Sequence, residues 1–159
     1  MADTDKLRIG FIGTGNIARG GHLRHLSGWD DVDLVAFCDI DERAAGSAVQ
    51  EYGGTAYTST ECMLDEVALD AVYVCLPPFA HTDQEILAAQ RGVALFVEKP
   101  LCVDLAKAAE INETIKNAGV VSAVGYNWRS TAITQIARER MAGKPVSAAF
   151  AYWIGGFPG

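Results

Sequence analysis

Short apolar runs alternate with helix-like stretches along most of this 159-residue chain. Such alternation is typical of β-α-β units, which build a parallel sheet. The runs are rich in Val, Ile, Leu and Phe with little polar alternation, as expected of strands that are covered on both faces. We expect strands at Leu7–Ile12, Leu34–Cys38, Ala71–Leu76, Ala94–Val97 and Val120–Val124, and a short one at Ala56–Tyr57.

Helix-like stretches fill the gaps between these runs. In Leu105–Ala118, apolar residues recur at spacings of three and four, which places them on one face of a helix. Asp104 stands where a side chain can cap this helix, Gly119 stands where the helix can end, and Asp41 is placed like Asp104 before the second helix. The other expected helices are Ile17–Leu26, Glu42–Tyr52 and Thr82–Arg91.

The turn after the first expected strand carries the pattern Gly13-Thr-Gly15-Asn-Ile-Ala18. Gly13 permits a tight turn, Gly15 lets the backbone approach a pyrophosphate, and Ala18 still allows the helix to pack closely on the sheet. The start of the helix would direct its free N–H groups at the phosphates, and Asn16 and Ile17 in the same turn are expected cofactor contacts. Because a strand precedes the pattern and a helix follows it, we predict a dinucleotide site rather than an unliganded glycine turn.

Asp39 ends the second expected strand, 24 residues after Gly15. An acid about 20 residues after such a glycine pattern hydrogen-bonds the ribose hydroxyls of the adenosine half. Its carboxylate would repel a 2′-phosphate, so we predict NAD as the cofactor rather than NADP. The alternative is a solvated acid or a helix cap, which suits Asp41 better.

Two further segments follow strands at the carboxyl edge, where open α/β sheets bind their ligands. Glu98-Lys99-Pro100 follows the run that ends at Val97. The ammonium group of Lys99 could hydrogen-bond a substrate oxygen and stabilise charge that develops there; the alternative is a surface Glu–Lys pair. Pro77 and His81 follow the expected fourth strand, where a structural role at a helix start is an equal alternative for His81.

The glycine pattern, Asp39 and Glu98-Lys99-Pro100 occur in the order found in one oxidoreductase family. The chain resembles the family named for glucose-fructose oxidoreductase, inositol dehydrogenase and the rhizopine-catabolism protein. The resemblance implies a Rossmann-type doubly wound parallel sheet, with Lys99 as a catalytic residue that contacts substrate and nicotinamide and with Glu98 holding the cofactor.

The resemblance extends to two less specific segments. The backbone around Pro77 and His81 would pass beside the cofactor, although Pro78 stands where the family often has Asn, so a side-chain amide contact is lost. The segment from Tyr126 to Arg129 resembles the family's domain junction. Asn127 and Arg129 are therefore expected cofactor contacts, with an ion pair at the junction as the alternative for the arginine.

We expect a dinucleotide-binding Rossmann domain over residues 1–125 and a linker helix with the first strand of a truncated α/β substrate domain over residues 126–159. The second part is predicted to contain a helix through Met141 and a long strand at Val146–Ile154. A lone strand would expose an open edge, so we expect the chain to form a homo-oligomer.

The activity that the resemblance implies is NAD-dependent oxidation of a secondary alcohol on a sugar, inositol or similar polyol, or the reverse reduction. The truncated chain alone would be inactive. An NAD-dependent glycosidase or lyase that uses transient oxidation is an alternative, which net release of NADH would distinguish. A non-catalytic dinucleotide-sensing module is another alternative, which the presence of Lys99 disfavours.

The net charge of −7 argues against partners such as a nucleic-acid backbone or an anionic membrane. No signal-peptide core begins the chain, and no apolar run approaches the roughly 20 residues that span a bilayer. The four cysteines lack C-x-x-C spacing, which is typical of a reducing, cytoplasmic compartment: Cys38, Cys62, Cys75 and Cys102.

The sequence predicts no metal site. His22 and His25 share an expected helix, but no Cys or carboxylate stands near them at ligand spacing. We interpret both as histidines on the helix surface.

Overall fold

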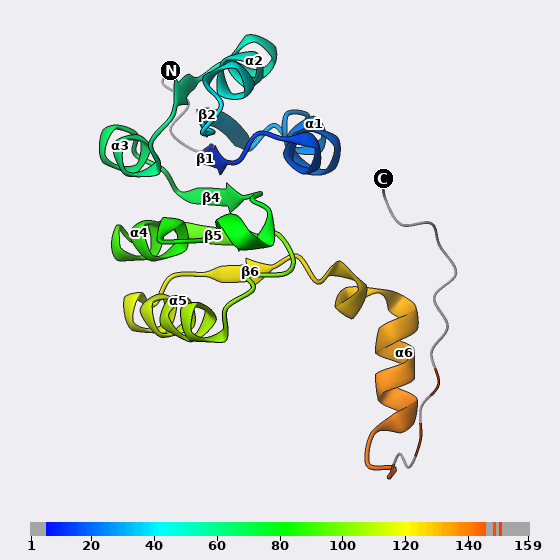
Figure 1. Ribbon diagram of the computed structural model, residues 1–159. Coiled ribbons are helices and arrows are strands. Elements are labelled where there is room, and N and C mark those ends of the chain that lie inside the picture. Colours follow the sequence, from blue (N-terminus) through cyan, green and yellow to red (C-terminus); the bar gives the residue numbers. More distant parts are fainter. Residues whose placement is uncertain (1–5, 146–147, 149, 151–159) are drawn as a thin grey trace. The chain divides into compact units, whose positions relative to one another are not determined.

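The computed structural model describes residues 6–145, Ala148 and Phe150 (Figure 1). The chain divides after Tyr126 into two units. Of the second unit, the structure describes a 3-10 turn, η3 (Asn127–Ser130), and a helix, α6 (Ala132–Met141). The strand expected at Val146–Ile154 lies outside the described residues except for Ala148 and Phe150.

A six-stranded parallel sheet forms the centre of the first unit, with the strand order β3-β2-β1-β4-β5-β6. The chain builds outwards from β1 to β3, returns to β4 beside β1, and then builds outwards in the opposite direction. This confirms the expected doubly wound Rossmann-type sheet, whose ligand crevice lies where the order reverses. The strands are β1 (Leu7–Ile12), β2 (Val32–Cys38), β3 (Thr55–Tyr57), β4 (Ala71–Val74), β5 (Ala94–Val97) and β6 (Ser122–Val124).

Helices cover both faces of the sheet. A π-helical segment, η1 (Ala18–Leu23), continues into α1 (Arg24–Leu26), and α2 (Glu42–Tyr52) joins β2 to β3. On the other face lie α3 (Thr60–Glu66), α4 (Gln84–Gln90) and α5 (Leu105–Ala118) (Figure 1). The helix predicted at Ile17–Leu26 is present, although Ala18–Leu23 within it is π-helical, and α3 was not predicted.

Two apolar clusters hold the helices to the sheet. Phe11 and Phe37 are fully buried in the cluster beneath η1, α1 and α2, and Val72 and Val74 are fully buried in the cluster on the opposite face. Burial on both faces explains why these strands read as continuous apolar runs. The carboxyl ends of the central strands are level, because Ile12 lies opposite both Cys38 and Val74.

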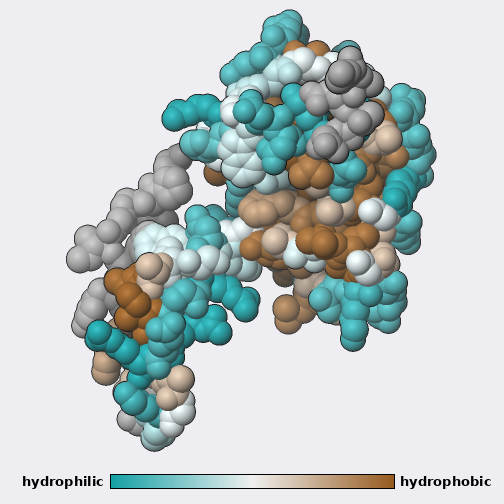
Figure 2. Space-filling model, turned by 180° about the vertical axis from the view of Figure 1, so that it is seen from behind, coloured by the Kyte–Doolittle hydropathy of each residue, from teal (hydrophilic) through white to brown (hydrophobic). Residues whose placement is uncertain are grey.

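Part of the sheet's α1 face is open. A depression of about 260 Å³ is lined there by apolar side chains that include Leu7, Trp29, Tyr73, Phe96 and Val121. Seen from behind, the first unit also displays a broad hydrophobic area (Figure 2). Within the described part of the chain, no helix has the length and apolar character needed to cross a membrane.

The expected caps are confirmed. The carboxylate of Asp104 accepts hydrogen bonds from the backbone N–H groups of Ala106 (2.7 Å) and Lys107 (3.4 Å) at the start of α5. Gly119 ends this helix in the left-handed region with φ +68°. Asp41 caps α2 by accepting from the N–H of Arg43 at 2.9 Å.

Candidate functional site

A crevice lies at the carboxyl edge of the sheet, where the strand order reverses between β1 and β4. It encloses about 310 Å³ and takes its walls from three loops. The loop after β1 supplies Gly15, Asn16 and Ile17, the loop after β4 supplies Cys75 to Pro78, and the loop after β5 supplies Glu98 and Lys99. The structure thus brings together six predicted site residues: Gly15, Asn16, Ile17, Pro77, Glu98 and Lys99.

Gly13 and Gly15 shape the first loop in different ways. Gly13 has φ +87°, and a Cβ atom there would lie 2.6 Å from the carbonyl oxygen of Cys75. Its N–H donates to the carbonyl of Cys38 at 2.8 Å, so the turn is fixed between β2 and β4. A Cβ atom on Gly15 would meet nothing within 4 Å, which leaves open space on the crevice side of the backbone.

The helical segment after this loop begins without a side-chain cap. No side chain occupies its first N–H groups, as in dinucleotide sites, although the N–H of Arg19 donates to the carbonyl of Gly15 at 3.1 Å. Ala18 is fully buried against the sheet. The open space at Gly15 together with these donors fits the pyrophosphate of a dinucleotide.

Asp39 lies directly after β2, on the far side of the glycine loop from β4. One carboxylate oxygen accepts from the N–H (2.8 Å) and the hydroxyl (3.1 Å) of Thr14, and the other accepts from the N–H of Asp41 (3.0 Å). The carboxylate is thereby held beside the glycine loop. The oxygen that accepts from Asp41 retains a lone pair for a ribose hydroxyl, whereas the oxygen facing Thr14 already accepts two hydrogen bonds.

Glu98 has defined partners on both carboxylate oxygens. One oxygen lies 2.8 Å from Nε2 of His22, and the other accepts from the backbone N–H of Lys99 at 3.1 Å. The interpretation of His22 as a helix-surface residue was wrong, since its side chain is only 18% exposed and reaches across the sheet to the loop after β5. Sequence gave no signal for this contact, because the two residues are 76 positions apart.

Lys99 is exposed at the mouth of the crevice, and its peptide bond to Pro100 is cis. Among the described residues, none forms an ion pair with its ammonium group. The lysine thus presents a hydrogen-bond donor and a positive charge to whatever occupies the crevice.

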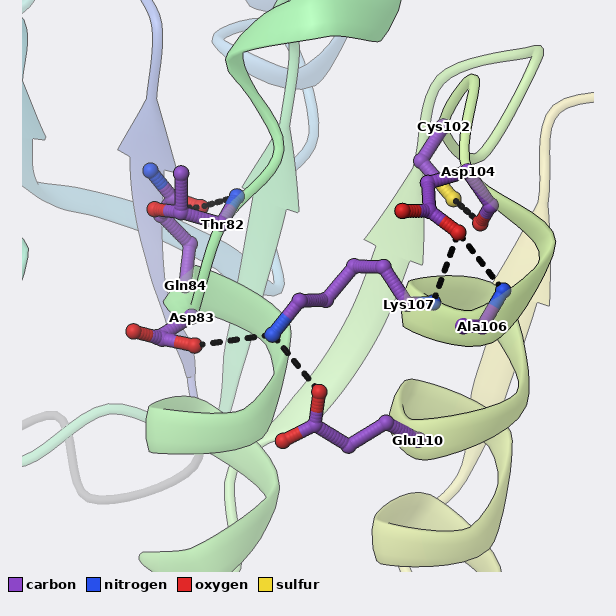
Figure 3. Close-up of polar contacts among 8 residues, drawn as sticks. All are labelled: Thr82, Asp83, Gln84, Cys102, Asp104, Ala106, Lys107 and Glu110. Atoms are coloured by element: carbon purple, nitrogen blue, oxygen red, sulfur yellow. Dashed lines mark hydrogen bonds and ion pairs between the residues drawn. The ribbon is translucent and has the colours of Figure 1, made fainter.

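A polar cluster links the segment before α4 to the start of α5 (Figure 3). Lys107, near the start of α5, contacts Asp83 before α4 at 3.2 Å and Glu110 at 2.6 Å. The hydrogen bonds to Glu110 and Asp83 raise the pKa of the Lys107 ammonium. The thiol of Cys102 donates to the carbonyl of Asp104 and fixes the turn that leads into α5.

The structure places His81 away from the crevice lining. It is buried, with Nδ1 hydrogen-bonded to Glu85 and Nε2 lying 3.3 Å from the carbonyl oxygen of Leu76. This geometry favours the structural alternative, in which His81 supports the wall from behind. The second carboxyl oxygen of Glu85 is buried without a partner among the described residues.

Cys75 lies in the crevice wall as a neutral thiol. Burial raises its pKa to about 12, and the nearby negative charge of Glu98 adds to the rise.

Asn127 and Arg129 belong to η3 in the second unit, where the carbonyl of Arg129 accepts from the side chain of Gln135 at 2.7 Å. Their assignment as cofactor contacts stays a prediction.

Within the described ranges, no group of three or more His, Cys, Asp or Glu side chains could hold a metal ion.

Comparison with known proteins places the first unit in a broad group of enzymes. Residues 7–126 match the model of an oxidoreductase family with an NAD-binding Rossmann fold. Glucose-6-phosphate 3-dehydrogenase of Bacillus subtilis is 29% identical over 132 residues, which cover 83% of this chain and 37% of that protein. D-xylose 1-dehydrogenase (NADP(+)) 2 of Haloferax volcanii is 31% identical over 137 residues, 86% of this chain and 42% of that protein.

Solved structures show the same similarity. The WlbA dehydrogenase from Bordetella pertussis, in complex with NADH and UDP-GlcNAcA, aligns with a TM-score of 0.77 at 27% identity. The match covers 86% of this chain and 42% of that one. The chain therefore spans about two fifths of the length of the relatives that it matches.

Proposed function

The chain belongs to this oxidoreductase family with an NAD-binding Rossmann fold, which is named for glucose-fructose oxidoreductase, inositol dehydrogenase and the rhizopine-catabolism protein. On this premise we propose that its crevice binds NAD for hydride transfer to or from a sugar or polyol. The observation that carries this proposal is the meeting of Gly15, Glu98 and Lys99 around one crevice at the strand reversal. The glycine loop suits a pyrophosphate, and the other two residues supply polar groups where chemistry can occur.

The order of the strands suggests how the dinucleotide lies. Asp39 after β2 marks the adenosine ribose, and Gly15 after β1 marks the pyrophosphate. The nicotinamide half then extends over the ends of β4 and β5, towards Pro77, Glu98 and Lys99. Bound NAD would supply a hydride acceptor at this end of the crevice.

Lys99 is the proposed catalytic residue. Its ammonium group can donate a hydrogen bond to the oxygen of a substrate carbinol or carbonyl. In the oxidation direction a base takes the hydroxyl proton, and this contact stabilises the negative charge that develops on the oxygen. In reduction it polarises the carbonyl. Glu98, held in place beside it, contributes to binding the cofactor.

The relatives named above include both an NADH complex and an NADP(+) enzyme, so the choice of cofactor must be argued from this chain's own residues. Asp39 is the proposed determinant of that choice. Its carboxylate would face the 2′-phosphate of NADP. A separation of about 6 Å at an effective dielectric constant of 20 to 40 gives a repulsion of roughly 1.5–3 kcal/mol per phosphate charge, or at least tenfold in affinity.

Calorimetric titration with NADH and NADPH tests the proposal. We expect NADH to bind at least tenfold more tightly, and Asp39→Ser to narrow the difference to a few-fold. Asp33→Ser, at an exposed position in β2, the strand that precedes Asp39, is the matched control and should leave the difference unchanged. Tighter binding of NADPH by the wild-type chain would reject NAD as the cofactor, and failure to bind either nucleotide would reject the proposed function.

The 159-residue chain on its own is proposed to bind the dinucleotide without turning over a polyol, since its relatives are more than twice as long as the matched region. Sustained NADH production from inositol or a free sugar by this chain alone would contradict this part of the proposal.

A further inference from the structure

His22 occupies an unusual position in the first helical segment. It lies in η1, a π-helix that spans Ala18–Leu23 directly after the glycine loop. π-Helical turns are rare and occur often at functional sites. Here the side chain lies over the sheet, with ring centroids 5.2 Å from those of both Tyr73 and Phe96.

The imidazole of His22 is the link between this helix and the loop after β5. Nε2 lies 2.8 Å from one oxygen of Glu98, whose other oxygen accepts from the N–H of Lys99. A carboxylate bound through both oxygens has little freedom to rotate. Gly125 lies close beside this group, since a Cβ atom added there would lie 3.5 Å from the Glu98 carboxyl and 3.3 Å from the Phe96 ring.

We propose that His22 is a positioning residue, which holds Glu98 against the Lys99 peptide and so sets the nicotinamide end of the crevice before the cofactor binds. The inference rests on the proposed function for the direction in which the dinucleotide lies. The contact should therefore affect the affinity for a ligand whose nicotinamide reaches β5, and not the affinity for a ligand that lacks the nicotinamide.

The aromatic neighbours allow hydrogen bonding to be separated from packing. His22→Phe keeps an aromatic ring between Tyr73 and Phe96 but removes the donor to Glu98. His22→Gln replaces the ring but returns an N–H donor on a side chain of similar reach. His25→Phe makes the same chemical change at an exposed position in α1 and is the matched control.

The experiment compares calorimetric affinities for NADH and ADP-ribose, which lacks the nicotinamide, and records the melting temperature of each variant. We expect His22→Phe to bind NADH about tenfold more weakly while its affinity for ADP-ribose stays within twofold of the wild type. His22→Gln should recover NADH affinity to within threefold. His25→Phe should match the wild type with both ligands.

Other outcomes overturn the inference. Unchanged NADH binding by His22→Phe shows that the contact positions nothing, and an equal loss for both ligands shows that His22 only supports the fold. If the Phe variant does not fold, His22→Asn, whose amide is too short to reach Glu98, must show the same selective loss; if this variant also fails to fold, the role of His22 is structural. A wild-type chain that binds neither ligand rejects the proposed function instead.

Discussion

Gly13 and Gly15 stand two residues apart in one loop, yet the structure predicts opposite consequences for the same substitution. In Gly13→Ala the new methyl group would lie 2.6 Å from the Cys75 carbonyl oxygen, on a backbone with φ +87°. A left-handed conformation costs an L-residue about 1–2 kcal/mol, and the close approach forces β1 and β4 to shift. We expect a total loss of about 3 kcal/mol, or a melting temperature roughly 10 °C lower.

Gly15→Ala should leave the fold intact, because the methyl group would meet nothing within 4 Å. The free energy of unfolding should stay the same or rise by up to about 1 kcal/mol, since alanine restricts the unfolded chain. The methyl group instead fills the space proposed for the pyrophosphate. Loss of one charge-assisted hydrogen bond costs about 1.5–3 kcal/mol, so NADH should bind roughly 10- to 100-fold more weakly.

Thermal unfolding without ligand and calorimetric titration with NADH separate the two effects. The reasoning is refuted if Gly15→Ala lowers the melting temperature as much as Gly13→Ala does, or if it binds NADH like the wild type. A Gly13→Ala chain as stable as the wild type would show that the turn is not confined by Cys75.

Two further predictions concern Cys75 in the crevice wall and the buried pair of His81 and Glu85. The Cys75 thiol, with a pKa of about 12, stays neutral when folded but ionises near its ordinary value of 9.0 when unfolded. Its contribution to the free energy of unfolding is therefore complete below pH 9 and is lost as the pH rises towards 12. Between pH 8 and pH 10, the free energy of unfolding measured in urea should fall by about 1 kcal/mol more for the wild type than for Cys75→Ala. Equal decreases would contradict this prediction. His81→Leu leaves the buried Glu85 carboxyl without its partner and should lower the free energy of unfolding by about 3 kcal/mol. The double variant His81→Leu with Glu85→Leu should lose less, because it removes the unpaired carboxyl. A double variant less stable than His81→Leu alone would disprove this account.

The predicted strands and helices that match the structure are those with strong local signals. The bounds of β1, β5, α2 and α5 agree with the sequence-based ranges. Each is an apolar run or an amphipathic stretch, and β1, α2 and α5 are each followed directly by a glycine. The missed helix, α3, has seven residues, of which only Met63 and Leu64 are buried, so its periodicity is too short to detect. Ser59, which accepts from the N–H of Cys62, was the available signal.

The candidate site could be predicted only where position along a strand determines position in space. Residues just after parallel strands must meet at one edge, which is why Gly15, Glu98 and Lys99 could be assigned to one crevice. The π-helical turn and the contact of His22 with Glu98 depend on packing between distant segments, and no local pattern indicates them. For His81, the partner four residues ahead, Glu85, was a signal that helical spacing offered.

The strand order also has a consequence for how the chain folds. Paired residues of β1 and β2, such as Leu7 and Val32, are 25 positions apart, whereas Ile9 of β1 and Ala71 of β4 are 62 apart. Loop-closure entropy and contact order both favour the nearer pairings, so the halves β1-β2-β3 and β4-β5-β6 can each form before they dock. Because the crevice forms only when the two halves dock, a ligand that contacts both of its sides stabilises the pairing of β1 with β4.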